Sequence, residues 1–290
     1  MKKIAIVHHD DNDGYFSAAI VAGAVDFDEV KYYPVNYKNN DWFDEILEVW
    51  FDHLYMLDFT AKPEQMDSII NIYEGKFTHI DHHPRAERYK KCIWDDRKSA
   101  TLLTFEYFYP EKIPGNCVEL IDIYDLWKKE KYWESALRFN LGFSLYMHDM
   151  SDSEHFVYDH KKSRSLYNRI AEKGGALYLD RKQYFDNKKV EPVSGDIANY
   201  LFEWWYEKIA VITTPYLTSA FCEDRLKKEG YEVVILSDVR YDEKSGSYLR
   251  KNSIRSLDKD VKVNALAGAF GGGGHPDAAG FWTDINFCRL

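Results

Sequence analysis

The chain has 290 residues, of which 45% are hydrophobic and 16% aromatic, and its formal net charge is −10. This length is typical of two domains of ordinary size, and the apolar content can supply a buried core for each. The negative charge argues against a broad basic surface, so a long nucleic acid duplex is not expected as a partner. A nucleic acid partner, if there is one, is predicted to be short.

Membrane insertion and disulfide formation are not expected. The N-terminal apolar run has only five residues before acidic residues follow, and no later stretch approaches the roughly 18 apolar residues of a membrane span. The four cysteines are scattered without CxxC spacing, which indicates neither a zinc ribbon nor a disulfide framework. We therefore expect a soluble, non-exported, cytoplasmic protein.

The first third of the chain alternates apolar strand patterns with amphipathic helix patterns. Strands are predicted at 4–7, 54–57 and 77–80, and helices at 15–25, 42–50 and 64–73. This alternation indicates βαβ units and a mostly parallel sheet. Each predicted strand ends in residues that can bind metals, at the sheet edge where such folds place their functional crevice.

A second α/β pattern follows a helical region. Helices are predicted at 99–109 and 117–129 and in the polar, aromatic segment after them, and 174–209 is predicted to be partly helical and to contain the domain connection. Beyond it we predict strands at 209–213, 231–236 and 248–256, and helices at 216–229 and 263–270. The last helix ends in four consecutive glycines.

Two short motifs carry metal-binding chemistry. In an extended segment alternate side chains share a face, so His9, Asp11 and Asp13 can converge on one region. The same residues also fit an acidic, solvated loop, and Asp58 taken alone fits a turn or helix cap. Asp81-His82-His83 is more specific, because a buried carboxylate beside two histidines is costly unless a cation or hydrogen bonds compensate it. Core histidines with satisfied hydrogen bonds are the alternative.

The ligand types indicate which metal and which reaction to expect. Carboxylates and imidazoles without thiolates suit Mn²⁺ or Mg²⁺ better than structural Zn²⁺, and shared carboxylates suit two ions about 3.5 to 4 Å apart. Such a pair generates hydroxide at neutral pH and stabilises a phosphoryl transition state. The predicted reaction is phosphoester hydrolysis.

These residues resemble the DHH phosphoesterase family, whose name-giving motif stands here as Asp81-His82-His83. The C-terminal part resembles the DHH-associated domain of that family through Ser253-Ile254-Arg255-Ser256 and the segment 270–280, FGGGGHPDAAG. The resemblance extends over nearly the whole chain and is closest to the short-oligoribonucleotide and pAp phosphatase type.

The resemblance implies roles for individual residues. His9 and Asp11 would bind one metal ion, Asp13 and His82 the other, and Asp58 would bridge both. A further ligand would be Asp125, with Asp122 as the alternative, and the catalytic pair Asp81 and His83 would orient a ligand or act on the scissile phosphate. The short spacing of His9 and Asp11 is closer to the single-strand exonuclease branch than to pAp phosphatases, which leaves the substrate open.

The glycine run and Arg255 are predicted to bind substrate. Consecutive glycines allow positive φ and exposed N–H groups that can contact a phosphate, although such a run can also be a flexible loop. Arg255 suits bidentate phosphate recognition, with a surface salt bridge as the alternative. The expected substrate-binding residues are Arg255, Gly272, Gly273, Gly274 and His275.

Together these features predict a two-domain α/β phosphoesterase with its active site in the cleft between the domains. The expected segments are a catalytic domain over 1–185, a linker helix region over 186–205 and a smaller substrate-binding domain over 206–290. The expected activity is manganese-dependent hydrolysis of short single-stranded oligonucleotides to nucleoside monophosphates, as in an oligoribonuclease or exonuclease. Alternatives are a cyclic or linear dinucleotide phosphodiesterase, a pAp phosphatase, or a silent nucleotide-binding regulator. Preference for RNA or DNA, substrate length, direction and the formation of a homodimer stay open.

Overall fold

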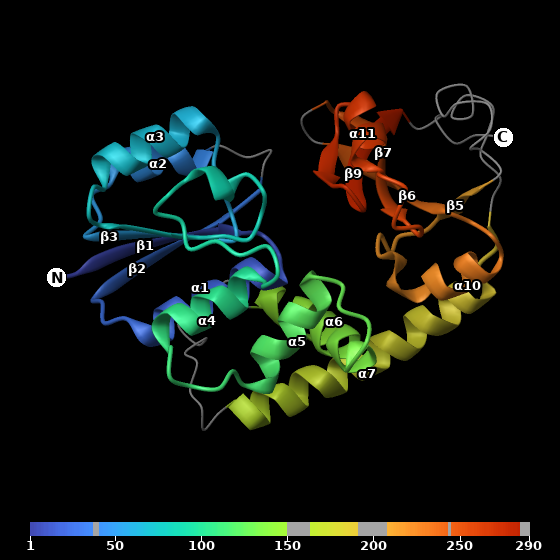
Figure 1. The fold of residues 1–290 in the computed structure, drawn as a ribbon, viewed down its shortest axis with the longest axis horizontal. Coiled ribbons are helices and arrows are strands. Elements are labelled where there is room, and N and C mark those ends of the chain that lie inside the picture. The colour runs from blue at the N-terminus through green and yellow to red at the C-terminus, as the bar shows by residue number, and fades with distance from the viewer. Residues whose placement is uncertain (37–40, 150–162, 191–207, 243–244, 285–290) are drawn as a thin grey trace. The chain divides into compact units, whose positions relative to one another are not determined.

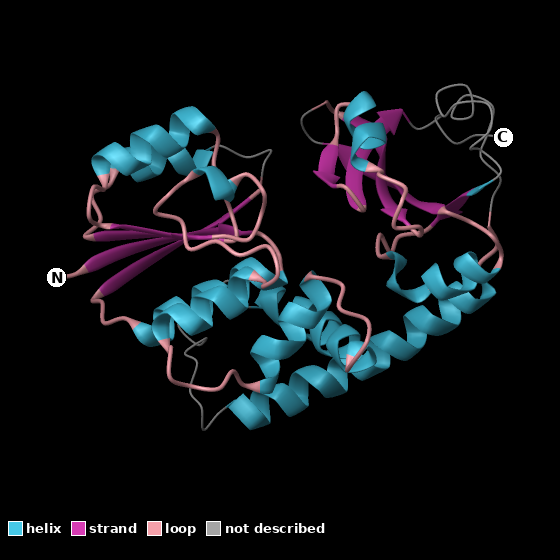
Figure 2. Cartoon of the chain, viewed as in Figure 1, coloured by secondary structure: helices cyan, strands magenta, loops and turns pink. Residues whose placement is uncertain are grey.

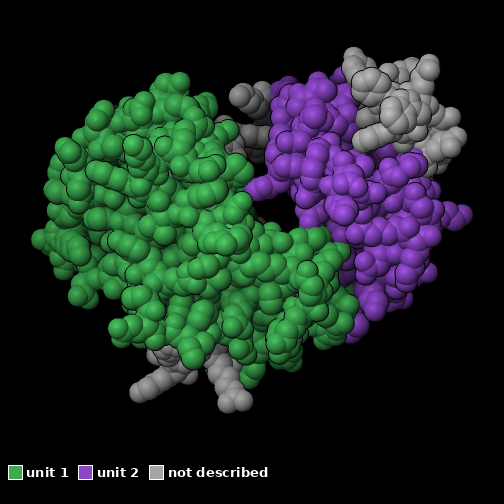
Figure 3. All heavy atoms as spheres, in the orientation of Figure 1, with its two compact units in different colours: residues 1–178 green, residues 179–290 purple. Residues whose placement is uncertain are grey.

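The computed structural model describes residues 1–36, 41–149, 163–190, 208–242 and 245–284. It divides into two compact units, Met1–Tyr178 and Leu179–Leu290 (Figure 3). The predicted α/β class with two domains is confirmed. Most of the expected linker, 186–205, lies outside the described residues, so its bounds and an active site between the domains stay predictions.

The N-terminal unit is built on a parallel sheet in the order β2-β1-β3-β4 (Figures 1 and 2). The strands are β1 Lys3–His9, β2 Glu29–Val35, β3 His53–Leu57 and β4 Phe77–Ile80. Three of them confirm predicted strands, whereas β2 was not predicted. Strand β2 lies at the sheet edge, where it is only partly buried and tolerates Pro34, so its apolar pattern is weak.

Helices cover both faces of this sheet, with α2 and α3 on one side and α1 and α4 on the other (Figure 1). Alternate residues of β1 show this directly, because Ala5 and Val7 pack toward α2 and α3 while Ile4 and Ile6 pack toward α1 and α4. Central strands buried on both faces explain why they read as continuous apolar runs. The helices of the two layers are α1 Asn12–Ala24, α2 Asp41–Glu48, α3 Pro63–Ile72 and α4 Ala100–Phe108.

Three further helices extend the α1 and α4 layer: α5 Asn116–Asp125, α6 Trp133–Asp149 and α7 Ser163–Asn187. They enclose an aromatic core that includes Phe16, Phe139 and Phe143. Helices α6 and α7 approach closely at Gly142 and Gly174, where an added Cβ on Gly174 would lie 1.6 Å from the carbonyl oxygen of Arg138. No described helix is long and apolar enough to cross a membrane. The cytoplasmic location stays a prediction.

The C-terminal unit has a mixed sheet in the order β5-β6-β7-β9-β8, in which only β5 and β6 are parallel. Its strands are β5 Ile209–Thr213, β6 Val233–Asp242, β7 Ser247–Ser256, β8 Gly273–His275 and β9 Ala278–Asp284. Its short helices are η4 Ser219–Phe221, α10 Glu223–Lys228 and α11 Asn264–Ala269, and a further short helix, η1 Ala86–Arg88, belongs to the N-terminal unit.

Two predictions for this unit need correction. The helix expected over 216–229 is limited to η4 and α10, because Cys222 between them has a non-helical conformation. The glycine run is not simply a loop, since its second half pairs with β9 as strand β8. Gly272 and Gly274 permit this pairing, because a Cβ at either position would lie within 2.6 Å of the β9 backbone.

Candidate metal centre

The candidate metal ligands gather at the carboxyl ends of β1, β3 and β4. Strand β2 lies on one side of β1 and β3 on the other, so the strand order reverses at β1, and ligand crevices form at such reversals. His9 ends β1, Asp58 follows β3, and Asp81 begins the segment after β4. The expected placement of the ligand residues at strand ends therefore corresponds to the topology that forms.

Asp58 occupies the centre of this cluster. Its side chain is only 1% exposed, and neither carboxylate oxygen accepts a hydrogen bond from a described residue. Three imidazole nitrogens lie near its oxygens, at 3.3 Å (His82 Nε2), 3.5 Å (His83 Nδ1) and 3.6 Å (His9 Nδ1). The residue also has a positive φ of 54°, which is strained for a side chain other than glycine. A buried carboxylate held in this way fits a cation ligand.

The turn from β1 into α1 positions His9 and Asp11. Asp11 is the N-cap of α1, and its Oδ1 accepts a hydrogen bond from the Gly14 N–H at 3.0 Å. Its Oδ2 lies 2.7 Å from His9 Nδ1, so one carboxylate both caps the helix and contacts the imidazole. Gly14 is required here, because a Cβ would lie 2.2 Å from the His9 carbonyl oxygen.

Asp13 is held by the start of α4. Its two oxygens accept hydrogen bonds from the backbone N–H groups of Ala100 and Thr101, both at 2.8 Å. The unsatisfied N–H groups of a helix start favour a negative charge there. His82 Nε2 lies 3.8 Å from Asp13 Oδ2 and 3.3 Å from Asp125 Oδ2, so these three residues form a second ligand group.

Asp125 and its alternative, Asp122, have different contacts in the structure. Asp122 accepts a hydrogen bond from the Ser99 N–H at 2.8 Å and pairs with Lys128 Nζ at 2.6 Å. Asp125, at the end of α5, instead has a buried Oδ2 beside His82, and no described residue donates a hydrogen bond to this oxygen. The geometry brings Asp125 into the candidate ligand set and gives Asp122 a structural position.

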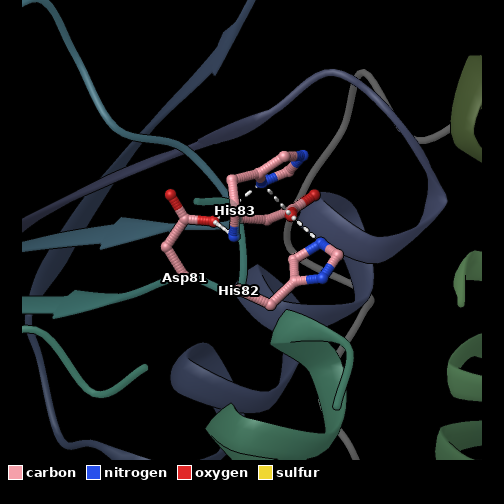
Figure 4. A group of neighbouring side chains, drawn as sticks. Asp81, His82 and His83 are labelled. Atoms are coloured by element: carbon pink, nitrogen blue, oxygen red, sulfur yellow. Dashed lines mark hydrogen bonds and ion pairs between the residues drawn. The ribbon is translucent and has the colours of Figure 1, made fainter. Parts of the chain in front are cut away.

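Asp81 and His83 form a hydrogen-bonded pair next to His82 (Figure 4). Asp81 Oδ1 accepts hydrogen bonds from His83 N at 3.0 Å and Nδ1 at 2.8 Å, and its Oδ2 accepts one from Thr60 Oγ1 at 2.5 Å. His79 Nε2 in turn lies 3.0 Å from Thr60 Oγ1. The carboxylate therefore fixes the orientation of the His83 ring with its Nδ1 protonated. Thr60 was not predicted as a site residue. The signal for it in the sequence is its position two residues after Asp58.

Protonation of the cluster reflects its excess of buried carboxylates. Burial and repulsion by Asp58 and Asp125 raise the pKa of Asp13 well above its usual range, and burial with repulsion by Asp58 raises the pKa of Asp125 to about 7. Burial opposes the charged form of His82, but Asp58 and Asp125 raise its pKa to about 11. A bound cation would offset the same repulsion between carboxylates and would compete with these protons.

The described residues offer three overlapping ligand groups. The first group is Asp58, Asp81, His82 and His83. The second is His9, Asp11 and Asp58, and the third is Asp13, His82 and Asp125. Within each group the ligand atoms lie within 4.8 Å of one another. Asp58 and His82 each belong to two of these groups. That Asp58 bridges two ions stays a prediction. Oxygen and imidazole donors without thiolates fit Mn²⁺ or Mg²⁺.

The predicted substrate residues lie together in the C-terminal unit. Arg255 on β7 and His275 on β8 both pair across β9 with Ala278, so they flank one residue on one face of the sheet. Arg255 Nε lies 3.7 Å from the buried carboxylate of Glu223. The salt bridge predicted as the alternative role of Arg255 is therefore present, and its partner Glu223 is buried.

Comparison with protein families identifies the C-terminal unit. The family model of the DHHA1 domain matches residues 206–284. These residues are a DHHA1 domain. The predicted resemblance to the DHH family is thereby confirmed, and the DHHA1 domain contains Arg255, His275 and the glycine run.

Solved structures extend the likeness to the fold of the whole chain. RecJ in complex with Mn²⁺ from Thermus thermophilus is similar with a TM-score of 0.54 and 16% identity, over 99% of this chain and 50% of RecJ. The pGpG-specific phosphodiesterase PggH from Vibrio cholerae is similar with a TM-score of 0.51 and 14% identity, over 98% of this chain and 94% of PggH. A search of curated protein sequences found no match. The chain therefore has a two-domain fold that these proteins share.

Proposed function

We propose that this chain is a manganese-dependent phosphoesterase that hydrolyses short oligonucleotides and releases nucleoside monophosphates. The observation that carries the proposal is Asp58, a buried carboxylate that accepts no hydrogen bond from the described residues and is shared by two of the ligand groups. The DHHA1 domain and the fold shared with manganese-bound RecJ support it.

Each ligand group would have its own task. His9 and Asp11 would hold one ion, Asp13, His82 and Asp125 the other, and Asp58 would bridge them. When bound, the two ions would supply a hydroxide at neutral pH and offset the charge that develops on the phosphoryl oxygens. His83, oriented by Asp81, would then contact the scissile phosphate or donate a proton to the leaving oxygen.

A second candidate function is hydrolysis of linear dinucleotides. The similarity to the pGpG-specific phosphodiesterase PggH covers nearly all of both chains, which favours this candidate. The two functions share the same chemistry and differ in the length of the substrate that the DHHA1 domain accepts.

One experiment tests both candidates. Protein stripped with a chelator is supplied with Mn²⁺ or Mg²⁺ and given a pentaribonucleotide, a pentadeoxyribonucleotide, pGpG, pAp and a cyclic dinucleotide in parallel. We expect turnover of the pentaribonucleotide with Mn²⁺ and none without metal. Faster turnover of pGpG than of the pentamer would favour the second candidate. Absence of metal-dependent turnover on every substrate would reject both, and would favour a silent nucleotide-binding module.

A further inference from the structure

We propose that Lys251 and Trp282 of the DHHA1 domain form a second nucleotide position, next to the one that Arg255 and His275 provide. The inference rests on the proposed function and deepens it, because it assigns residues that select substrates of two or more nucleotides. It concerns the C-terminal unit alone.

The strand register places these residues in consecutive rows on one face of the sheet. The first row contains Arg255 of β7, Ala278 of β9 and His275 of β8. The second row contains Ser253, Gly280 and Gly273 of the same three strands. In the third row, Lys251 of β7 pairs with Trp282 of β9. Directly paired residues, and residues two apart along a strand, point to the same face. The first and third rows are four residues apart, about 13 Å along the strand, a length that one to two extended nucleotides can span.

The residues of this part of the face are partly or fully exposed, and they lie outside the apolar core on the same side of the sheet. The apolar core beneath α10 and the end of α7 is formed mainly by β5 and β6, and no described side chain of β7, β8 or β9 belongs to it. Between the first and third rows lie small residues, Gly280 and Gly273, with the partly exposed Ser253. A flat ligand can therefore pass from Arg255 to Trp282 without meeting a bulky side chain of these strands.

The third row has the chemistry of a nucleotide site. Lys251 Nζ lies over the partly exposed indole ring of Trp282, 6.0 Å from its centroid, so the two side chains form one cationic and aromatic pair. An indole face stacks on any base, and a nearby lysine contacts the phosphate that follows it. Asp238 lies opposite Lys251 on β6, but its Oδ2 accepts a hydrogen bond from Arg240 Nε at 2.8 Å. The local charge of these three residues is +1.

This arrangement predicts which ligands bind more tightly through Trp282 and Lys251. A tetranucleotide or a linear dinucleotide has a second base for Trp282, whereas pAp has one base and can fill only one position. Trp282 and Lys251 should therefore contribute to the affinity for oligonucleotides and contribute little for pAp.

The test measures binding directly, without added metal. A fluorescently labelled tetraribonucleotide is titrated with the full-length chain in chelator, and anisotropy gives its Kd, while unlabelled pAp is measured by competition. The variants are Trp282→Ala, Trp282→Phe and Lys251→Gln. Tyr248→Ala is the control, because Tyr248 is an exposed aromatic residue on β7 whose position in the register gives it the opposite face of the sheet.

We expect Trp282→Ala to weaken tetranucleotide binding about five- to hundredfold, the range for loss of one stacked base. Trp282→Phe should recover most of this loss, Lys251→Gln should reduce the salt dependence of binding, and Tyr248→Ala should have no effect. Unchanged tetranucleotide affinity in Trp282→Ala, an equal loss for pAp, or no tetranucleotide binding by the wild type would overturn the inference. Hydrolysis with Mn²⁺ is scored separately, so binding without hydrolysis would reject only the proposed function.

Discussion

The conformation of Asp58 is costly in several ways at once. The residue combines a positive φ, almost complete burial and two carboxylate oxygens that accept no hydrogen bond within the described part of the chain. Each of these features alone is unfavourable by roughly one to a few kcal/mol. The strand end that holds Asp58 is fixed by its neighbours, since its N–H donates to the Ile80 carbonyl at 2.9 Å. Such a residue is expected where function requires its placement.

Replacing Asp58 with Asn tests its role as the bridging ligand. Asn accepts the same positive φ and has nearly the same shape, so the fold should be retained. The loss of the shared negative charge should lower kcat by about three orders of magnitude or more, because catalysis rests on metal electrostatics. Initial rates with saturating Mn²⁺ provide the measurement. The exposed neighbour Asp10 gives the control Asp10→Asn, and similar rates for the two variants would contradict the assignment.

The paired substitutions Asp125→Asn and Asp122→Asn should separate binding from stability. Asp122→Asn weakens the contacts with Ser99 and Lys128, so its melting temperature should fall while Mn²⁺ binding is retained. Asp125→Asn removes one of several crowded buried charges, so its metal-free form should melt no lower than the wild type, but Mn²⁺ should no longer stabilise it fully. Thermal melts with and without Mn²⁺ measure both effects. The reverse pattern would assign the ligand role to Asp122.

At the scale of elements, the two central strands that carry the site could be predicted because they are buried on both faces. Strands β1 and β3 are short apolar runs followed by ligand residues, and pattern alone locates them. Strand β4 lies at the sheet edge with only Phe77 and Ile80 as apolar residues, and the Asp81-His82-His83 motif marks its end. Strand β2 at the edge has no such pattern, and α10 is shorter than the helix that the pattern predicted. Strand β8 consists of Gly-Gly-His, and only its pairing with β9 makes it a strand. Long-range pairing of this kind is not encoded in local sequence.

Some of the candidate metal ligands could likewise be predicted from local sequence, whereas the choice of one of them depends on tertiary contacts. His9, Asp11 and Asp58 follow strands, so their convergence is predictable. Asp122 and Asp125 are three residues apart on one helix, so helical periodicity cannot choose between them. The choice depends on tertiary contacts, namely the Ser99 N–H that donates to Asp122 and the His82 ring beside Asp125.

The close crossing of α6 and α7 gives a prediction with an adjacent control. Gly174→Ala would place a Cβ 1.6 Å from the Arg138 carbonyl oxygen, so the helices must separate, and stability should fall by roughly 1–3 kcal/mol. Gly175→Ala meets only the end of the Arg138 side chain at 3.6 Å and should raise stability by up to about 1 kcal/mol. Chemical denaturation measures both. Equal effects would show that the two helices do not depend on this contact.

At the scale of the whole molecule, the two units have separate cores, and the candidate metal ligands belong to only one of them. Added Mn²⁺ should therefore stabilise the N-terminal unit selectively. A site with bound metal gains about 2.7 kcal/mol when the free ion is at 100 times its Kd. Hydrogen exchange with and without Mn²⁺ should show new protection at 8–14 and 56–60 and no change in 247–256. Equal protection in both units would contradict a metal centre confined to the first.

The same division predicts that substrate binding and bond cleavage can be separated by mutation. Arg255 lies in the DHHA1 domain, whereas His9, Asp58 and His82 lie in the unit that carries the metal ligands. If Arg255 binds a phosphate remote from the reacting one, Arg255→Gln should lower kcat/KM on a pentaribonucleotide about ten- to a thousandfold, the range for one charged phosphate contact. A small chromogenic phosphodiester has no second phosphate and cannot use the contact, so its hydrolysis should be almost unchanged.

The choice of glutamine matters for this test because Arg255 also faces the buried Glu223. Removal of the whole side chain would leave that carboxylate with a hydrogen bond from Ser219 and without its nearby guanidinium, which can destabilise the domain. Glutamine keeps a donor near Glu223 while it removes the charge, and a melting curve shows whether the fold is intact. An equal loss of activity on both substrates in a folded variant would place Arg255 in the chemistry itself. A selective loss on the pentaribonucleotide would assign substrate binding to the DHHA1 domain.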